Sequence, residues 1–161
     1  MKITRQVGKR VLLLQTFVLI CVLGVISCTY SPKEIRTVIK TERAPEAIGP
    51  YSQGILVGNT LYTAGQIGLN PNTNEMTGTD IELQARQVLE NLKAVVEASG
   101  MKMENVVEAQ VFLADMSDYS AFNAIYSEYF TESPPARAVI EASALPLNAK
   151  VEIKVTAVKV E

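Results

Sequence analysis

A long amphipathic helix between two strand-rich segments is the strongest constraint that the sequence places on the fold. From Ile81 to Val96, apolar residues recur at intervals of one, three and four, which is the spacing of one helix face. Thr79 is a suitable N-cap, and Gly100 is placed to end the helix. A helix with one apolar face must bury that face against another element, and the flanking segments predict a sheet for this purpose.

Six strand-like segments surround this helix and a shorter second one. They span residues 35–40, 51–57, 60–64, 106–113, 137–141 and 151–160. The second helix is expected to begin at Ser117 or Asp118 and to stop before Pro134 and Pro135. It carries an apolar stripe, which we interpret as core packing, of Tyr119, Phe122, Ile125, Tyr126 and Tyr129. This order predicts an α+β fold with a six-stranded mixed sheet and two helices packed on one face.

The sheet is expected to have one face that the helices do not cover. Val57, Leu61 and Val111 cannot all point toward the helices together with their neighbours. The opposite face is therefore expected to be partly apolar and to form a subunit interface.

The first 27 residues have the pattern of a secretory signal peptide. Four basic residues and no acid stand in 1–10, and 11–26 is nearly all apolar. Residues 23–28 (Leu-Gly-Val-Ile-Ser-Cys) then resemble a bacterial lipobox, so Cys28 is expected to become a lipidated N-terminus. An uncleaved anchor helix is the alternative, although the apolar run is shorter than the roughly 20 residues that span a bilayer. Both interpretations predict an exported, membrane-anchored protein on the periplasmic or outer-membrane face, with a tether over 28–36 and one domain over 37–161.

Composition excludes several classes of chemistry. The sequence contains no histidine, which removes Ser-His-Asp and Cys-His catalysis and imidazole zinc sites, and no metal site is expected. Processing would remove Cys21 and leave no free thiol for catalysis. Without the leader and its four basic residues, 11 Lys and Arg stand against 17 Asp and Glu, which argues against nucleic acid as a partner. Walker and GxGxxG phosphate loops are also absent from the sequence.

Two charged residues near the C-terminus are the strongest candidates for chemistry. Arg137 and Glu152 lie in two strand-like segments about one hairpin apart. A guanidinium binds a planar carboxylate through paired N–H groups, and a partly buried carboxyl with a raised pKa can transfer protons. The pair is therefore suited to holding a small carboxylate and activating a water molecule beside it. In the simpler interpretation, Arg137 is a surface or ion-pair residue and Glu152 faces solvent.

Four blocks of the sequence resemble the Rid (YjgF/YER057c/UK114) family, in the family's order. They are 47–54 (Ala-Ile-Gly-Pro-Tyr-Ser-Gln-Gly), 63–67 (Thr-Ala-Gly-Gln-Ile), 122–126 (Phe-Asn-x-x-Tyr), and 135–153 with its Pro-Ala-Arg-Ala and Val-Glu-Ile runs. The resemblance covers roughly residues 38–160. It implies a chorismate-mutase-like fold of the bacillary type and a homotrimer with clefts between subunits. It also implies hydrolysis of reactive enamines and imines, such as 2-aminoacrylate, to 2-oxo acids and ammonia without a cofactor or metal.

The same resemblance implies roles for individual residues. Arg137 matches the arginine that holds the substrate carboxylate, and Glu152 matches the glutamate that positions or activates water. Tyr51 and Asn123 match residues that line or support the cleft.

Two departures from the family pattern concern the substrate-binding positions. Ala64 stands where many members have serine, and Ala138 and Val139 replace a hydroxyl or thiol often found after the arginine. With Ala64 and Val139 at the substrate, we expect a more apolar cleft that suits a larger or less polar side chain than that of 2-aminoacrylate.

Export leaves a second function open. Deaminases of this family are expected in the cytoplasm, beside the pyridoxal-phosphate enzymes that release such imines. The leader would direct this domain out of the cytoplasm. The alternative is a non-catalytic, trimeric, membrane-tethered module that binds a small carboxylate or a protein. RNA cleavage, suggested for some relatives, is disfavoured by the acidic charge and by export.

Overall fold

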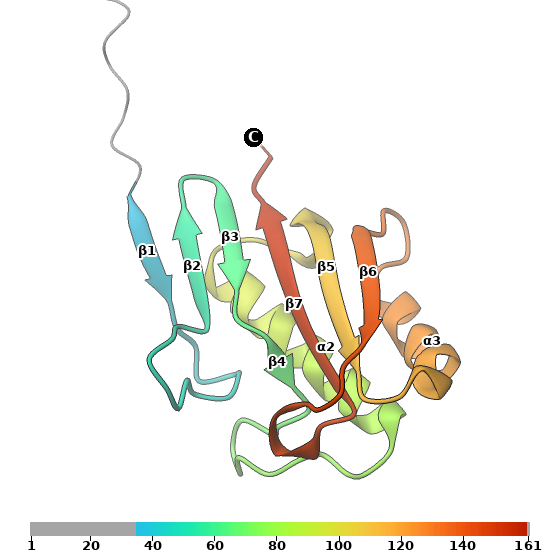
Figure 1. Cartoon of the computed structure of the whole chain (residues 1–161). Coiled ribbons are helices and arrows are strands. Elements are labelled where there is room, and N and C mark those ends of the chain that lie inside the picture. The colour runs from blue at the N-terminus through green and yellow to red at the C-terminus, as the bar shows by residue number, and fades with distance from the viewer. Residues whose placement is uncertain (1–34, 161) are drawn as a thin grey trace, which may run out of the picture. The chain divides into compact units, whose positions relative to one another are not determined.

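The computed structural model describes residues 35–160 (Figure 1). The expected signal peptide, the lipidation site Cys28 and nearly all of the tether lie outside these residues. Neither of the α-helices within 35–160 is long and apolar enough to cross a membrane.

Residues 35–160 form a single mixed sheet of seven strands (Figure 1). The strands are β1 (Arg36–Ile39), β2 (Gly54–Val57), β3 (Thr60–Thr63), β4 (Gln66–Ile67), β5 (Val106–Leu113), β6 (Ala136–Glu141) and β7 (Val151–Val158). Their order across the sheet is β1-β2-β3-β7-β5-β6, and β4 also pairs with β7. All paired strands are antiparallel except β5 and β6, which run parallel. The mixed sheet and its six predicted strands are confirmed.

The short strand β4 makes the sheet seven-stranded rather than six-stranded. Strand β3 pairs with β7 as far as Tyr62, which lies opposite Thr156. Pairing with β7 resumes in β4 at Gln66, which lies opposite Ile153. Between the two strands, the hydroxyl of Thr63 accepts from the N–H of Val155 (2.9 Å) and donates to its C=O (3.2 Å). A two-residue strand has no periodicity of its own, so the sequence pattern does not predict it.

Both helices pack on one face of the sheet, as predicted (Figure 1). Helix α2 spans Ile81–Ala98 and helix α3 spans Tyr119–Tyr129. The N-cap of α2 is Asp80 rather than the predicted Thr79, and its side chain accepts from the N–H of Leu83 at 2.9 Å. Asp and Thr are both good N-caps, so side-chain type alone does not separate them. Short 3-10 turns lie at Met103–Asn105, Met116–Asp118 and Pro146–Asn148.

The hydrophobic core lies between the two helices and the sheet. Leu61 and Val111 are fully buried in it, so the expectation that they help to make the other face apolar is wrong. Strand alternation and register place other apolar side chains on the open face: Val38, Ile55, Val57, Tyr62, Phe112 and Ile140. Of the three residues expected to contribute to the open face, Val57 lies on it. The open face is partly apolar, as expected.

Candidate active site

Arg137 extends from β6, at one edge of the sheet, toward helix α3. The parallel register places it beside Ala109 of β5, which is buried against the helices. Paired residues of neighbouring strands share a face of the sheet, so Arg137 also points to the helical side. There its guanidinium reaches the first two turns of α3.

The guanidinium of Arg137 lies against three aromatic rings. Its Cζ atom is 4.4 Å from the ring centroid of Tyr126, 5.8 Å from that of Phe122 and 5.9 Å from that of Tyr119. These distances are within the range of cation–π attraction. The Nη2 atom donates to Oδ1 of Asn123 (2.7 Å) and to the hydroxyl of Tyr119 (3.2 Å). We call Arg137 and these four partners the arginine cluster.

The positive charge of the arginine cluster has no acidic partner among the residues that the structure describes. Arg137 is partly buried, its hydrogen-bond partners are neutral, and the salt bridges found within 35–160 do not involve it. A hollow of about 390 Å³ lies beside the guanidinium and is lined by Asn123, Tyr126, Ser127, Phe130, Pro134, Pro135 and Arg137. A partly desolvated, unpaired guanidinium next to such a space is suited to binding a small carboxylate.

The hydroxyl of Tyr126 is buried and has no hydrogen-bond partner in the described part of the chain. Burial raises the pKa of Tyr126 to about 12, and the nearby charge of Arg137 opposes this shift with a smaller effect. Tyr126 therefore stays neutral at physiological pH. Its ring, rather than its hydroxyl, supports Arg137.

Val139 is not part of the arginine cluster. It lies two residues beyond Arg137 on the same face of β6, where it packs against the hydrophobic core and does not line the hollow. Of the predicted site residues, the structure thus brings Asn123 to Arg137 but places Val139 in a packing position.

Glu152 lies on the open face of the sheet. Its neighbours Val151 and Ile153 are fully buried under the helices, so the side chain between them points the other way. Across β7, it stands between Phe112 of β5 and Ile67 of β4. Burial raises the pKa of the Glu152 carboxyl, and no charged group among the described residues contributes to the shift. Such a carboxyl is suited to proton transfer closer to neutral pH than an exposed glutamate.

The carboxylate of Glu152 rests against the bend between β3 and β4. A Cβ atom at Gly65 would lie only 1.9 Å from its Oε1, so glycine is the residue that leaves room for it. Ala64, just before, is partly buried, and its N–H donates to the C=O of Gln53 (2.9 Å). The predicted site residue Ala64 is therefore next to the residue that Glu152 contacts. We call Glu152, Gly65 and Ala64 the glutamate bend.

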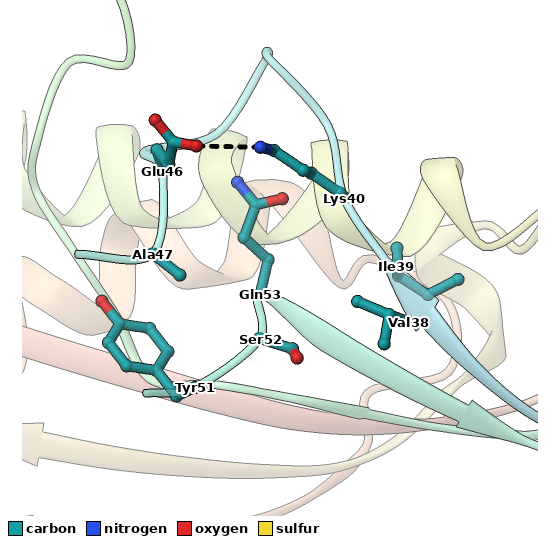
Figure 2. Close-up of a pocket in the computed structure, with 8 residues that line it drawn as sticks. All are labelled: Val38, Ile39, Lys40, Glu46, Ala47, Tyr51, Ser52 and Gln53. Carbon is teal, nitrogen blue, oxygen red and sulfur yellow. Dashed lines mark hydrogen bonds and ion pairs between the residues drawn. The ribbon is translucent and has the colours of Figure 1, made fainter. Parts of the chain in front are cut away.

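Tyr51 lies in the loop between β1 and β2, and 52% of it is exposed. The buried side chain of Gln53 holds this loop by accepting from one N–H and donating to three C=O groups within residues 41–45. A pocket of about 190 Å³ lies here, and the Lys40–Glu46 ion pair (2.8 Å) is part of its lining. Tyr51 lies on one side of this pocket and the ion pair on the other (Figure 2). The loop is tied to the glutamate bend through Gln53.

Arg137 and Glu152 are not brought together within one chain. Strand β5 lies between β6 and β7, and the two side chains point to opposite faces of the sheet. The chain thus carries two separate groups of predicted site residues, the arginine cluster on the helical side and the glutamate bend on the open side.

Some residues that shape these groups are not predicted from the sequence. Tyr119, Phe122 and Tyr126 recur at three and four residues along α3, and this signal is ordinarily core packing. Phe122 and Tyr126 are indeed buried, yet all three rings face Arg137. Buried Asn91 of α2 donates to the C=O groups of Ile67 (3.1 Å) and Leu69 (2.9 Å), and so holds β4 beside Glu152.

A family model described as Endoribonuclease L-PSP matches residues 41–159 of the chain. A RutC family protein from Sulfurisphaera tokodaii is 52% identical over 115 residues, which cover 71% of this chain and 92% of that protein. A 2-iminobutanoate/2-iminopropanoate deaminase from Escherichia coli is 47% identical over 124 residues, which cover 75% of this chain and 96% of the relative.

The fold is also similar to that of solved structures. The crystal structure of the YjgF gene product from Escherichia coli matches with a TM-score of 0.75 and 46% sequence identity, over 77% of this chain and 99% of that one. The chorismate-mutase-like architecture expected from the sequence is confirmed.

Proposed function

The chain belongs to the Endoribonuclease L-PSP family, which is the Rid family that its sequence blocks resemble, and on this premise we propose that it is an enamine/imine deaminase. Its substrates would be small 2-imino acids and their enamine tautomers, such as 2-aminoacrylate. The products are the 2-oxo acid and ammonia. The observation that carries the proposal is the unpaired guanidinium of Arg137 beside an open hollow, because each of these substrates has a carboxylate next to the reacting carbon.

The two groups of residues have complementary roles in this reaction. Arg137 binds the carboxylate and so fixes the C=N carbon in space. The oxygen of a water molecule then bonds to that carbon while Glu152 takes a proton from the water and passes it to the nitrogen. In the collapse of the resulting carbinolamine, Glu152 moves the hydroxyl proton to the nitrogen, the C=O bond forms, the C–N bond breaks and ammonia leaves. Imines also hydrolyse in water, so positioning together with one acid/base group supplies the catalysis, and no metal or cofactor enters the scheme.

A site with both residues requires a second copy of the chain. We therefore propose a homotrimer in which the arginine cluster of one subunit meets the glutamate bend of another. Two observations support the assembly: the two groups point to opposite faces, and the open face carries the exposed apolar side chains Val38, Tyr62 and Ile140.

Mixing two inactive variants tests the shared site. Arg137→Ala and Glu152→Gln chains are unfolded and refolded together in equal amounts. If each site takes its arginine and its glutamate from different subunits, about a quarter of the sites regain both residues and activity returns to that level. Each site would lack one residue if both came from the same chain, and the mixture would stay as slow as its components.

The reaction itself is tested by generating 2-aminoacrylate in situ and following the release of 2-oxo acid and ammonia. We expect wild type to exceed spontaneous hydrolysis, and Arg137→Ala and Glu152→Gln each to lose most of this excess. A wild-type rate equal to the spontaneous one would refute the deaminase proposal for this substrate. Carboxylate binding without turnover would instead favour the non-catalytic binding module.

The location outside the cytoplasm is a separate proposal that rests on the leader sequence. We propose that Cys28 carries a lipid that attaches the domain to a membrane. In cells fed a labelled fatty acid, Cys28→Ser is expected to lose the label and to leave the membrane fraction. Retention of the label in this variant would refute lipidation at Cys28.

A further inference from the structure

The open face of the sheet carries charges of both signs where strands β5 and β7 lie side by side (Figure 1). Lys154 and Thr156 follow Glu152 along β7 at intervals of two residues, so all three side chains share the open face. Glu108 of β5 lies opposite Thr156, and Gln110 lies opposite Lys154. The open face thus holds an acid and a base at diagonal positions of two paired strands.

These two charges do not bind each other within one chain. Diagonal neighbours on paired strands are roughly 7–8 Å apart, a distance that long side chains can bridge. The salt bridges found within residues 35–160 nevertheless include neither Lys154 nor Glu108. The carboxylate of Glu108 instead accepts from the side-chain amide of Gln110 (3.2 Å) and from the hydroxyl of Thr156 (3.3 Å). Water therefore solvates the ammonium of Lys154 in a single chain, where this residue is exposed.

A molecule that covers the open face would change this situation. Val38, Tyr62 and Ile140 on this face are each more than half exposed, which is typical of a surface that another molecule covers. Removal of an unpaired charge from water is strongly unfavourable. The covering molecule must therefore bring an acid to Lys154 and a base to Glu108.

A second copy of the chain brings both. The acids at open-face positions of the described strands are Glu108 and Glu152. Glu152 is a poor partner for Lys154, because an ammonium in contact would lower the pKa of this carboxyl, which burial raises. Glu108 and Lys154 are diagonal neighbours, so a symmetry axis that passes close to one of them passes close to the other. In a ring of identical subunits the same contact recurs at every interface, and every Lys154 and every Glu108 then has a partner.

We propose that Lys154 of each subunit forms an ion pair with Glu108 of the next subunit in the homotrimer. The pair fixes the register between subunits. It also holds the ammonium at Glu108 and away from Glu152, which lies two residues before Lys154 on the same face of β7. The inference rests on the assembly proposed for the deaminase.

Charge reversal tests the ion pair, with sedimentation equilibrium of the full chain in density-matched detergent as the measurement. Lys154→Glu places two acids at the contact, and Glu108→Lys places two bases there. Like charges in an interface repel, so each reversal should raise the subunit concentration at which half of the trimer dissociates on the order of a hundredfold. The double variant Glu108→Lys/Lys154→Glu restores opposite charges and should assemble nearly as wild type does. Lys93→Glu is the matched control, because it makes the same change of charge on α2, on the other side of the sheet, and should leave assembly unchanged.

A mixture of the two single variants shows whether the pair joins different subunits. Lys154→Glu chains carry the acid that the new base of Glu108→Lys chains needs, so opposite charges meet again wherever unlike subunits touch. The mixture should therefore form trimers at a concentration at which each variant alone dissociates. A pair within one chain would stay mismatched in both variants, and a mixture that dissociates as its components do overturns the proposal. Wild-type assembly of either single variant overturns it too, and so does a double variant that assembles no better than the single variants.

Failure of the ion pair can be told apart from failure of the deaminase proposal. Sedimentation does not depend on turnover, so a wild-type trimer that hydrolyses no imine refutes the deaminase alone, and the reversals still decide the pair. A trimer that both reversals leave intact refutes the pair alone. If wild type forms no trimer, the pair falls together with the proposed assembly.

Discussion

Replacement of Gly65 by alanine tests whether the position of the Glu152 carboxylate matters. The new Cβ atom would lie 1.9 Å from Oε1 and 2.8 Å from Cδ of Glu152, and real Cβ contacts essentially never fall below 3.0 Å. The carboxylate must therefore move by about 1.1 Å or more. Gly65 is not among the glycines with positive φ, so alanine adds no backbone strain there.

The expected effect on the rate is large and the effect on stability is small. A misplacement of about 1 Å in a catalytic site costs on the order of a hundredfold in rate. This factor corresponds to about 2.7 kcal/mol of activation free energy. Glu152 is only partly buried and its side chain can swing toward the open face, so the free energy of unfolding should change by less than about 1 kcal/mol.

A double-mutant cycle shows whether the loss acts through Glu152. The excess rate over spontaneous imine hydrolysis is measured for Gly65→Ala, Glu152→Ala and the double variant, and urea unfolding is followed for each. Glu152→Ala removes the atoms that the new methyl group would meet, so we expect the double variant to be no slower than Glu152→Ala alone. The reasoning is refuted if Gly65→Ala keeps full activity, or if it slows the Glu152→Ala enzyme as much as it slows wild type.

Four further predictions follow from the contacts of the described residues. The raised pKa of Glu152 should place the acidic limb of kcat/KM above pH 4.5, and Glu152→Gln should abolish this limb. As pH rises above 4.5, Glu152 loses its carboxyl proton in the unfolded chain before it does so in the folded chain. The unfolding free energy of wild type should therefore fall relative to that of Glu152→Gln above pH 4.5 and not below it. Urea titrations at several pH values measure this difference. Tyr126→Phe should not lower the unfolding free energy, because the buried hydroxyl has no hydrogen-bond partner among the described residues. A decrease of about 1 kcal/mol or more would show that the hydroxyl does have such a partner. Asn91→Ala should lower the unfolding free energy by roughly 1–3 kcal/mol and slow imine hydrolysis, because the C=O of Leu69 loses the side-chain donor and the C=O of Ile67 keeps only the N–H of Leu69; wild-type stability would contradict this role.

The parts of the fold that local patterns determine are the parts that the sequence predicts. Helix α2 has a long apolar period, and its observed span agrees with the expected one at both ends within a residue or two. Strand β4 is different, because its pairing partner β7 lies far along the chain and the bend before it depends on the hydroxyl of Thr63. Such non-local pairing leaves no periodic signal in the sequence.

The same distinction explains what the sequence predicts about the site. The identity and spacing of Arg137 and Glu152 mark them as candidates, and their strands follow each other along the chain. Their separation by a short connection is compatible with a hairpin, in which the two side chains could be neighbours. The structure instead pairs β6 in parallel with β5 and places β5 between β6 and β7. Strand order is decided by packing of the whole sheet, so the placement of the two residues on opposite faces cannot be deduced from their spacing.

The separation of the two charges within one chain has a chemical consequence. An arginine in contact with Glu152 would lower the pKa of the carboxyl and form an ion pair with it, and both residues would lose their use in the proposed reaction. Here the pKa of Glu152 is raised by burial alone, and Arg137 contacts neutral groups alone among the described residues. In the proposed trimer, the substrate would lie between the two, with its carboxylate balancing the arginine and its C=N carbon facing the glutamate. An assembly that inserts the substrate between charges held on different subunits keeps the arginine available for the carboxylate and keeps the glutamate basic enough to accept a proton from water.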